Sequence, residues 1–228
     1  MNNLPQIIED IRADLTARNE LRDSTLRRSR DLIRLCAQSI RAVHRHEFDD
    51  AAGLLAEARA AAAQMLAAIE AMPDLFYTGY TQDSLKELTE AHLVYAFVNG
   101  GDLPTPQEIG VPSHTYLNGM SEAGTEMRRF ALDMIRRGLV AEAEPFLSIM
   151  DEVYSQNITI DFPDAITGGL RRQTDVLRGT LERTRGDVTM AMRQEQMRQA
   201  LAAFEERVMG TSGLLADAIM SPLETDDE

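Results

Sequence analysis

Apolar residues recur every three or four positions along most of the chain, and no segment alternates apolar and polar residues over a sustained length. The first pattern is typical of amphipathic helices, whereas alternation would have indicated strands. Proline and glycine interrupt the pattern at a few places, where we expect helices to end. The predicted helices span about 6–47, 49–72, 75–99, 113–138, 140–157 and 161–185.

The longest predicted connection lies in the middle of the chain, over residues 100–112. It contains three prolines and three glycines, and we expect a loop there with a short turn at 106–109. Gly100 and Gly101 should end the preceding helix, because glycine readily adopts the left-handed conformation of a helix C-cap. Ser113 is expected to cap the helix that follows.

The end of the chain shows a weaker pattern. Gly186 is expected to interrupt the last helix before a final helical segment that ends near 209. Beyond that point basic residues are scarce and the last five residues are mostly acidic, which favours a disordered tail. We therefore predict an all-α protein, with a single bundle of about six to seven long antiparallel helices over 1–209 and a disordered acidic tail over 210–228.

The composition of the 228-residue chain fits such a bundle. Hydrophobic residues make up 44%, tryptophan is absent, and aromatic residues make up 5%, so the core must consist mostly of aliphatic side chains and the 12 methionines. The single cysteine, Cys36, excludes an intrachain disulfide and is expected to be a small buried core residue. No apolar run reaches the length of a membrane span or follows a basic start, so we expect a cytoplasmic protein without membrane contact.

Charge is distributed unevenly along the sequence. The net charge is −14, which argues against indiscriminate binding to nucleic acid, yet residues 12–45 carry nine arginines against four acids. At 100° per residue, one sector of the first helix collects Arg27, Arg30, Arg34, Arg41 and Arg45. This arginine stripe is either a phosphate-binding surface, since arginine pairs bidentately with phosphate, or a solvated face that pairs with acids of neighbouring helices.

Two helices each carry a pair of glutamates on one face. Glu87 and Glu90 are three residues apart, and Glu122 and Glu126 are four apart. If both pairs point into the bundle, they supply four oxygen ligands to a hard divalent cation, and without histidine in the motif Mg²⁺ or Mn²⁺ fits better than zinc or iron. The alternative is that each pair lies on an ordinary solvated face.

The remaining candidates for chemistry are weaker. The four histidines, His44, His46, His92 and His114, show no catalytic spacing, and His92 is expected to be a packing residue. The sequence contains no phosphate-binding loop, dinucleotide fingerprint or nucleophile elbow.

Several segments, in this order, are similar to the translin family over about residues 22–188. The glutamate segment E-L-T-E-A at 87–91 resembles the E-x-x-E-A of the translin-associated factor X branch. The segment Y-L-N-G-M-S-E-A-G-T-E at 116–126 resembles the family motif Y-L-x-G-x-x-D-x-x-x-E, with Glu122 where the family usually has aspartate. Further resemblance to the first and last helices of the family lies in 29–34, 39–45, 170–172 and 185–186.

This resemblance implies a bundle of about seven helices and a homo-oligomer, commonly an octamer, that encloses a cavity. It also implies binding of single-stranded RNA or DNA and, in the factor X branch, a metal-dependent endoribonuclease whose catalytic and metal-binding carboxylates match Glu87, Glu90, Glu122 and Glu126. The arginine stripe would then contact nucleic acid or a neighbouring subunit. Two alternatives are a non-catalytic single-stranded RNA- or DNA-binding oligomer and a structural helical oligomer whose carboxylates only pair with arginine.

Overall fold

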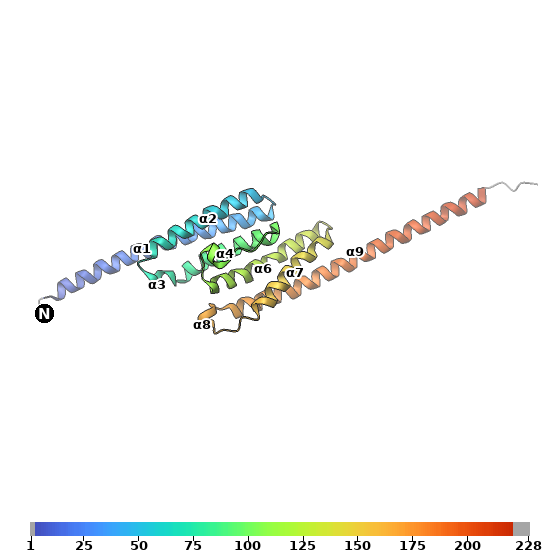
Figure 1. The fold of residues 1–228 in the computed structure, drawn as a ribbon. Coiled ribbons are helices and arrows are strands. Elements are labelled where there is room, and N and C mark those ends of the chain that lie inside the picture. The colour runs from blue at the N-terminus through green and yellow to red at the C-terminus, as the bar shows by residue number, and fades with distance from the viewer. Residues whose placement is uncertain (1–2, 221–228) are drawn as a thin grey trace, which may run out of the picture.

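The computed structural model describes residues 3–220, and within this range it contains helices and no strand, which confirms the predicted all-α class (Figure 1). One short 3₁₀-helix, η1 (Val140–Ala143), precedes α7. The α-helices are α1 (Leu4–His44), α2 (Phe48–Ile69), α3 (Pro73–Phe76), α4 (Gly79–Asn99), α5 (Pro106–Ile109), α6 (Ser113–Arg136), α7 (Glu144–Asn157), α8 (Asp164–Thr167) and α9 (Leu170–Met220).

The long helices pack side by side in a bundle. Helix α1 packs on α2 and α4, α4 packs on α6, and α6 packs on both α7 and α9 (Figure 1). Each helix turns its apolar face inward, and burying a side chain the size of leucine contributes roughly 1.5–3 kcal/mol. The core is aliphatic and rich in methionine, as predicted, and includes the fully buried Leu32, Cys36, Met65, Leu88, Met127, Met150 and Leu177.

The helical structure is interrupted just before α9 and not in the middle of this helix. Gly168 and Gly169 have φ of 60° and 86°, so they form a left-handed turn that separates α8 from α9. The predicted interruption at Gly186 is wrong, because α9 continues through it. Thr184 and Val188 are buried on either side of Gly186, and their packing outweighs the cost of about 1 kcal/mol for a glycine inside a helix.

Other helix ends differ less from the prediction. Gly100 adopts φ of 73° and ends α4, and the expected turn at 106–109 is the short helix α5. Ser113 is the first residue of α6 rather than its cap, since Pro112 occupies the cap position. Helix α9 runs to Met220, eleven residues into the predicted tail, and 221–228 lie outside the described residues.

Both terminal helices extend beyond the bundle, in opposite directions (Figure 1). Residues 4–20 of α1 are exposed along their whole length, and the described side chains of α9 beyond Val188 are mostly exposed. Large apolar side chains nevertheless recur on these extensions, including Leu4, Ile8, Ile11 and Leu15 on α1 and Met197, Leu201, Phe204 and Val208 on α9. In amphipathic helices such residues normally face a partner surface.

Helix α2 meets the length and hydropathy of a membrane span, which the sequence pattern did not lead us to expect. Its apolar character comes largely from alanine, and Ala51, Ala58 and Met65 are fully buried against the bundle. This buried face is the packing that a core helix of a bundle requires.

Candidate metal centre

Helices α4 and α6 approach each other closely at Gly119. A Cβ atom at this position would lie 2.7 Å from Cβ of Thr89 and 2.8 Å from the backbone oxygen of Lys86, so only glycine fits. Gly119 lies three residues before Glu122, on the same face of α6. The close contact therefore brings Glu122 against the part of α4 that carries the other glutamate pair.

Three carboxylates meet at this crossing. Glu87, Glu90 and Glu122 each offer an oxygen, and these oxygens all lie within 4.8 Å of one another. Burial, followed by repulsion from Glu87 and Glu122, raises the pKa of Glu90 to about 8. Burial and repulsion from Glu122 also raise the pKa of Glu87. We refer to these three residues as the carboxylate cluster.

Two further side chains fix the orientation of Glu122. Lys86 Nζ and Gln173 Nε2 each donate a hydrogen bond of 2.8 Å to Glu122 Oε1. Burial lowers the pKa of Lys86, but its hydrogen bond and attraction to Glu122 outweigh burial and raise the pKa above its ordinary value. Lys86 is the only lysine of the chain, and it thus places a permanent positive charge at one edge of the cluster.

Glu126 lies beside the cluster but is directed elsewhere. Its Oε1 is 2.6 Å from Nε2 of His44, a buried ring that stacks on Phe130 at a centroid distance of 4.1 Å. Repulsion from Glu126 contributes to the raised pKa of Glu90, so the two carboxylates are close enough to interact. The structure thus brings together three of the four predicted glutamates in one cluster and holds the fourth next to it through His44.

The donor set fits a hard divalent cation. Carboxylate oxygens are the ligands that Mg²⁺ and Mn²⁺ prefer. Within the described residues, Glu87 and Glu90 have no hydrogen-bond or ion-pair partner, although both are partly buried. A cation bound among the three carboxylates would supply the missing countercharge and offset the repulsion that contributes to the raised pKa values of Glu87 and Glu90.

The arginine stripe lies on the outer face of α1. All five of its side chains, those of Arg27, Arg30, Arg34, Arg41 and Arg45, are exposed. Two of them pair locally, Arg34 with Asp31 at 3.4 Å and Arg45 with Glu47. These partners lie on α1 itself and directly after it, so the ion pairs found within the described part of the chain do not tie the stripe to a neighbouring helix.

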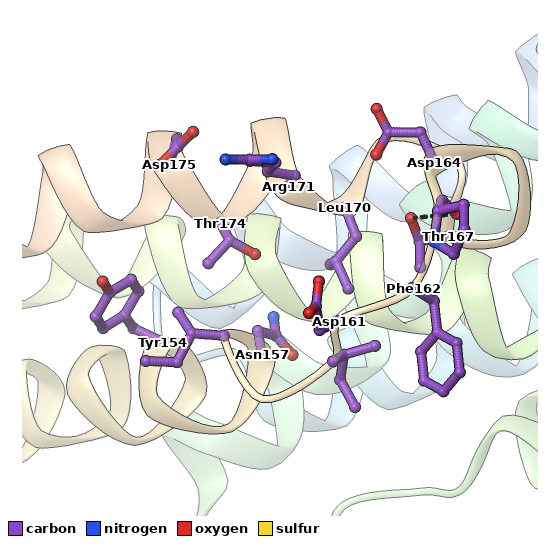
Figure 2. Close-up of a pocket in the computed structure, with 13 residues that line it drawn as sticks. Tyr154, Asn157, Asp161, Phe162, Asp164, Thr167, Leu170, Arg171, Thr174 and Asp175 are labelled. Atoms are coloured by element: carbon purple, nitrogen blue, oxygen red, sulfur yellow. Dashed lines mark hydrogen bonds between the residues drawn. The ribbon is translucent and has the colours of Figure 1, made fainter.

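Two cavities flank the start of α9. One, of about 600 Å³, lies between the beginnings of α4, α6 and α9 and includes Lys86 and Gln173 in its lining. The other, of about 670 Å³, lies between α7, α8 and α9 (Figure 2). Neither cavity was predicted from the sequence.

Sequence reasoning also missed several residues that build the site. The sequence offered one signal for Lys86, which directly precedes Glu87 as the only lysine, and one for Gly119, which precedes Glu122 by less than a helical turn. His44 and Gln173 gave no signal, because they are 82 and 51 residues away from the glutamates that they contact. His92 is buried, with Nδ1 2.8 Å from the Leu88 carbonyl, as expected of a packing residue.

The chain is similar to several known proteins over most of its length. No family model matches the chain. An uncharacterized protein of Methanocaldococcus jannaschii is 26% identical over 192 residues, which cover 82% of this chain and 83% of that protein. Among solved structures, AfC3PO is 28% identical with a TM-score of 0.70, and its complex with duplex RNA is 27% identical with a TM-score of 0.68.

A third structure, apo-NeC3PO, shares the fold with a TM-score of 0.73 at 17% identity. Each of the three comparisons covers 81% of this chain and 96% of the solved one. The class that the fold and the site define is an all-α bundle with an acidic centre between two neighbouring helices. Within that class, the chain is similar to the C3PO structures, which supports a translin-like family.

Proposed function

We propose that this protein is a translin-like endoribonuclease that cleaves single-stranded RNA with the help of Mg²⁺ or Mn²⁺. The observation that carries the proposal is the carboxylate cluster, since an RNA-binding protein without catalysis has no need of three partly buried acids that repel one another. The similarity to AfC3PO, which has been solved with duplex RNA, supports RNA as the ligand.

Different residues of the site would have different roles in catalysis. Glu87, Glu90 and Glu122 would hold the cation, while Lys86 and Gln173 keep Glu122 in position. Such a cation acidifies water and neutralises charge on a phosphate. Glu126, held by His44, lies next to the cluster and would accept a proton from the attacking water.

The arginine stripe would hold the RNA backbone without reading its sequence, because contacts to phosphates position a nucleic acid but do not distinguish bases. Single-stranded DNA carries the same phosphates and should bind to the same surface. The alternative function is a non-catalytic single-stranded RNA- or DNA-binding protein, and the exposed stripe supports this alternative equally well.

We further propose that the protein is a homo-oligomer. The apolar side chains on the projecting ends of α1 and α9, such as Ile11 and Leu15 at 49% and 59% exposure, support assembly with further copies. An octamer is what the family resemblance implies.

The test of the enzymatic function is incubation of the purified protein with labelled single-stranded RNA in Mg²⁺, in Mn²⁺ and in excess chelator. We expect cleavage with either cation and none with chelator. Glu90→Gln and Glu126→Gln should abolish cleavage but retain RNA binding, because the amides keep the shape of the side chains and remove their charge. Full activity in either variant, or cleavage in chelator, would leave the non-catalytic binding protein as the better description.

A further inference from the structure

The cavity of about 600 Å³ adjoins the carboxylate cluster directly. Lys86 and Gln173 both line it, and both hydrogen-bond to Glu122. Its volume lies within the roughly 300–1,000 Å³ that is common for small-ligand sites. Any group bound in this cavity would therefore lie beside the cluster.

The lining of the cavity favours an anion. Helices α4, α6 and α9 all begin at it, as shown by Gly79, His114 and Gly169 in its wall, so three positive helix ends converge there. Lys86 is already paired with Glu122, so Arg172 is the cationic side chain of the lining that remains for an anion, and Asp83 is the carboxylate of the lining. Arg172 is exposed, and no ion pair to it is found within residues 3–220, so its guanidinium is available to a ligand.

An aromatic side chain also lines this cavity. Tyr77, between α3 and α4, is 73% exposed, although tyrosine usually buries much of its ring. Its ring stands nearly perpendicular to that of Phe76, with the two centroids 5.0 Å apart, and most of the ring is open to solvent. An open aromatic face next to positive charge is the combination with which proteins bind single-stranded nucleic acid.

We propose that this cavity binds one nucleotide of a single-stranded RNA, with the base stacked on Tyr77 and a phosphate held by Arg172. The inference rests on the proposed function in that it takes RNA to be the ligand. It adds a subsite that places the chain next to the carboxylate cluster. Because a base can stack on Tyr77 only when it is unpaired, the subsite also selects single-stranded over duplex RNA.

The second cavity provides matched controls. It lies on the other side of α9, where Arg171 and the 61% exposed Phe162 line it (Figure 2). Three carboxylates, those of Asp161, Asp164 and Asp175, share this lining with a single arginine, so it repels phosphate. Arg171→Ala and Phe162→Ala thus remove the same charge and a similar ring area as Arg172→Ala and Tyr77→Ala, outside the proposed subsite.

The experiment measures binding of a fluorescein-labelled, mixed-sequence 12-nucleotide RNA by anisotropy, in chelator, so that neither a cation nor cleavage contributes. Tyr77→Ala should weaken binding about five- to hundredfold, the range found for loss of one base–aromatic stack, and Tyr77→Phe should bind like the parent. Arg172→Ala should weaken binding and lower the slope of log K against log salt by about 0.7, as expected for one lost phosphate contact. Phe162→Ala and Arg171→Ala should change neither quantity.

A duplex of the same sequence completes the test, and Tyr77→Ala should leave its affinity unchanged. The proposal is overturned if the parent does not bind the single strand, if Tyr77→Ala and Arg172→Ala bind it within twofold of the parent, or if the control variants lose as much. Equal losses for duplex and single strand would also overturn it. Failure of the enzymatic function appears separately, as absence of cation-dependent cleavage by a parent protein that still binds RNA through Tyr77 and Arg172.

Discussion

Replacing Glu90 by glutamine should stabilise the cation-free protein at alkaline pH. Burial and the neighbouring glutamates raise the pKa of Glu90 from 4.5 to about 8, so between these values the folded chain holds a proton that the unfolded chain has lost. The unfolding free energy therefore falls as pH rises through this window. At 1.36 kcal/mol per unit, the parent should lose roughly 3 kcal/mol between pH 5.5 and 8.5 through this group. Glutamine does not titrate and should not show this loss.

The assay is urea unfolding at pH 5.5 and 8.5, in chelator and at fixed protein concentration. The quantity of interest is the change with pH in the difference between Glu90→Gln and the parent, because titrating groups distant from Glu90 cancel in that difference. Glu57→Gln, at an exposed position on α2, serves as the control and should follow the parent. An equal pH dependence of the parent and Glu90→Gln would refute the conclusion that Glu90 is a buried, repelled carboxylate.

Three further predictions concern the helix crossing, the arginine stripe and assembly. Gly119→Ala should lower the unfolding free energy by about 1–3 kcal/mol, because the added methyl group overpacks the helix crossing. Gly53→Ala has open space around it and should raise the unfolding free energy by about 0.5–1 kcal/mol. Thermal unfolding measures both changes. Neutralising Arg27 and Arg30 together should reduce the salt slope of single-stranded RNA binding by about 1.4, and an unchanged slope would reassign the stripe to subunit contacts. Ile11→Asp should reduce the oligomer mass measured by light scattering, and an unchanged mass would exclude this face of α1 from assembly.

The sequence predicted the parts of the site that depend on helical geometry alone. Glu87 and Glu90 lie on one face of α4 because they are three residues apart. Glu122 and Glu126 lie on one face of α6 because they are four residues apart. That both helices would face each other came from the family resemblance rather than from spacing. What decides their approach is Gly119, whose role depends on Thr89 of the opposite helix, and no periodicity along one helix contains that information.

The remaining differences between the prediction and the structure arise from tertiary packing. His44 contacts Glu126 across 82 residues of sequence, so the prediction of four converging glutamates could not anticipate a competing partner for one of them. Gly186 and Gly168 are both glycines near the last helix, and local sequence did not distinguish them. Burial of Val188 keeps the helix continuous at Gly186, whereas the positive φ at Gly168 creates the turn.

The central claim is that the carboxylate cluster of Glu87, Glu90 and Glu122 binds a divalent cation. Titration with Mn²⁺, followed by the electron paramagnetic resonance signal of the free ion, measures this binding directly and independently of any RNA. We predict a bound Mn²⁺ in the parent and in Glu57→Gln that is lost in Glu90→Gln, because the amide removes an anionic ligand. Equal Mn²⁺ binding by the parent and Glu90→Gln, or no binding by the parent, would contradict the account.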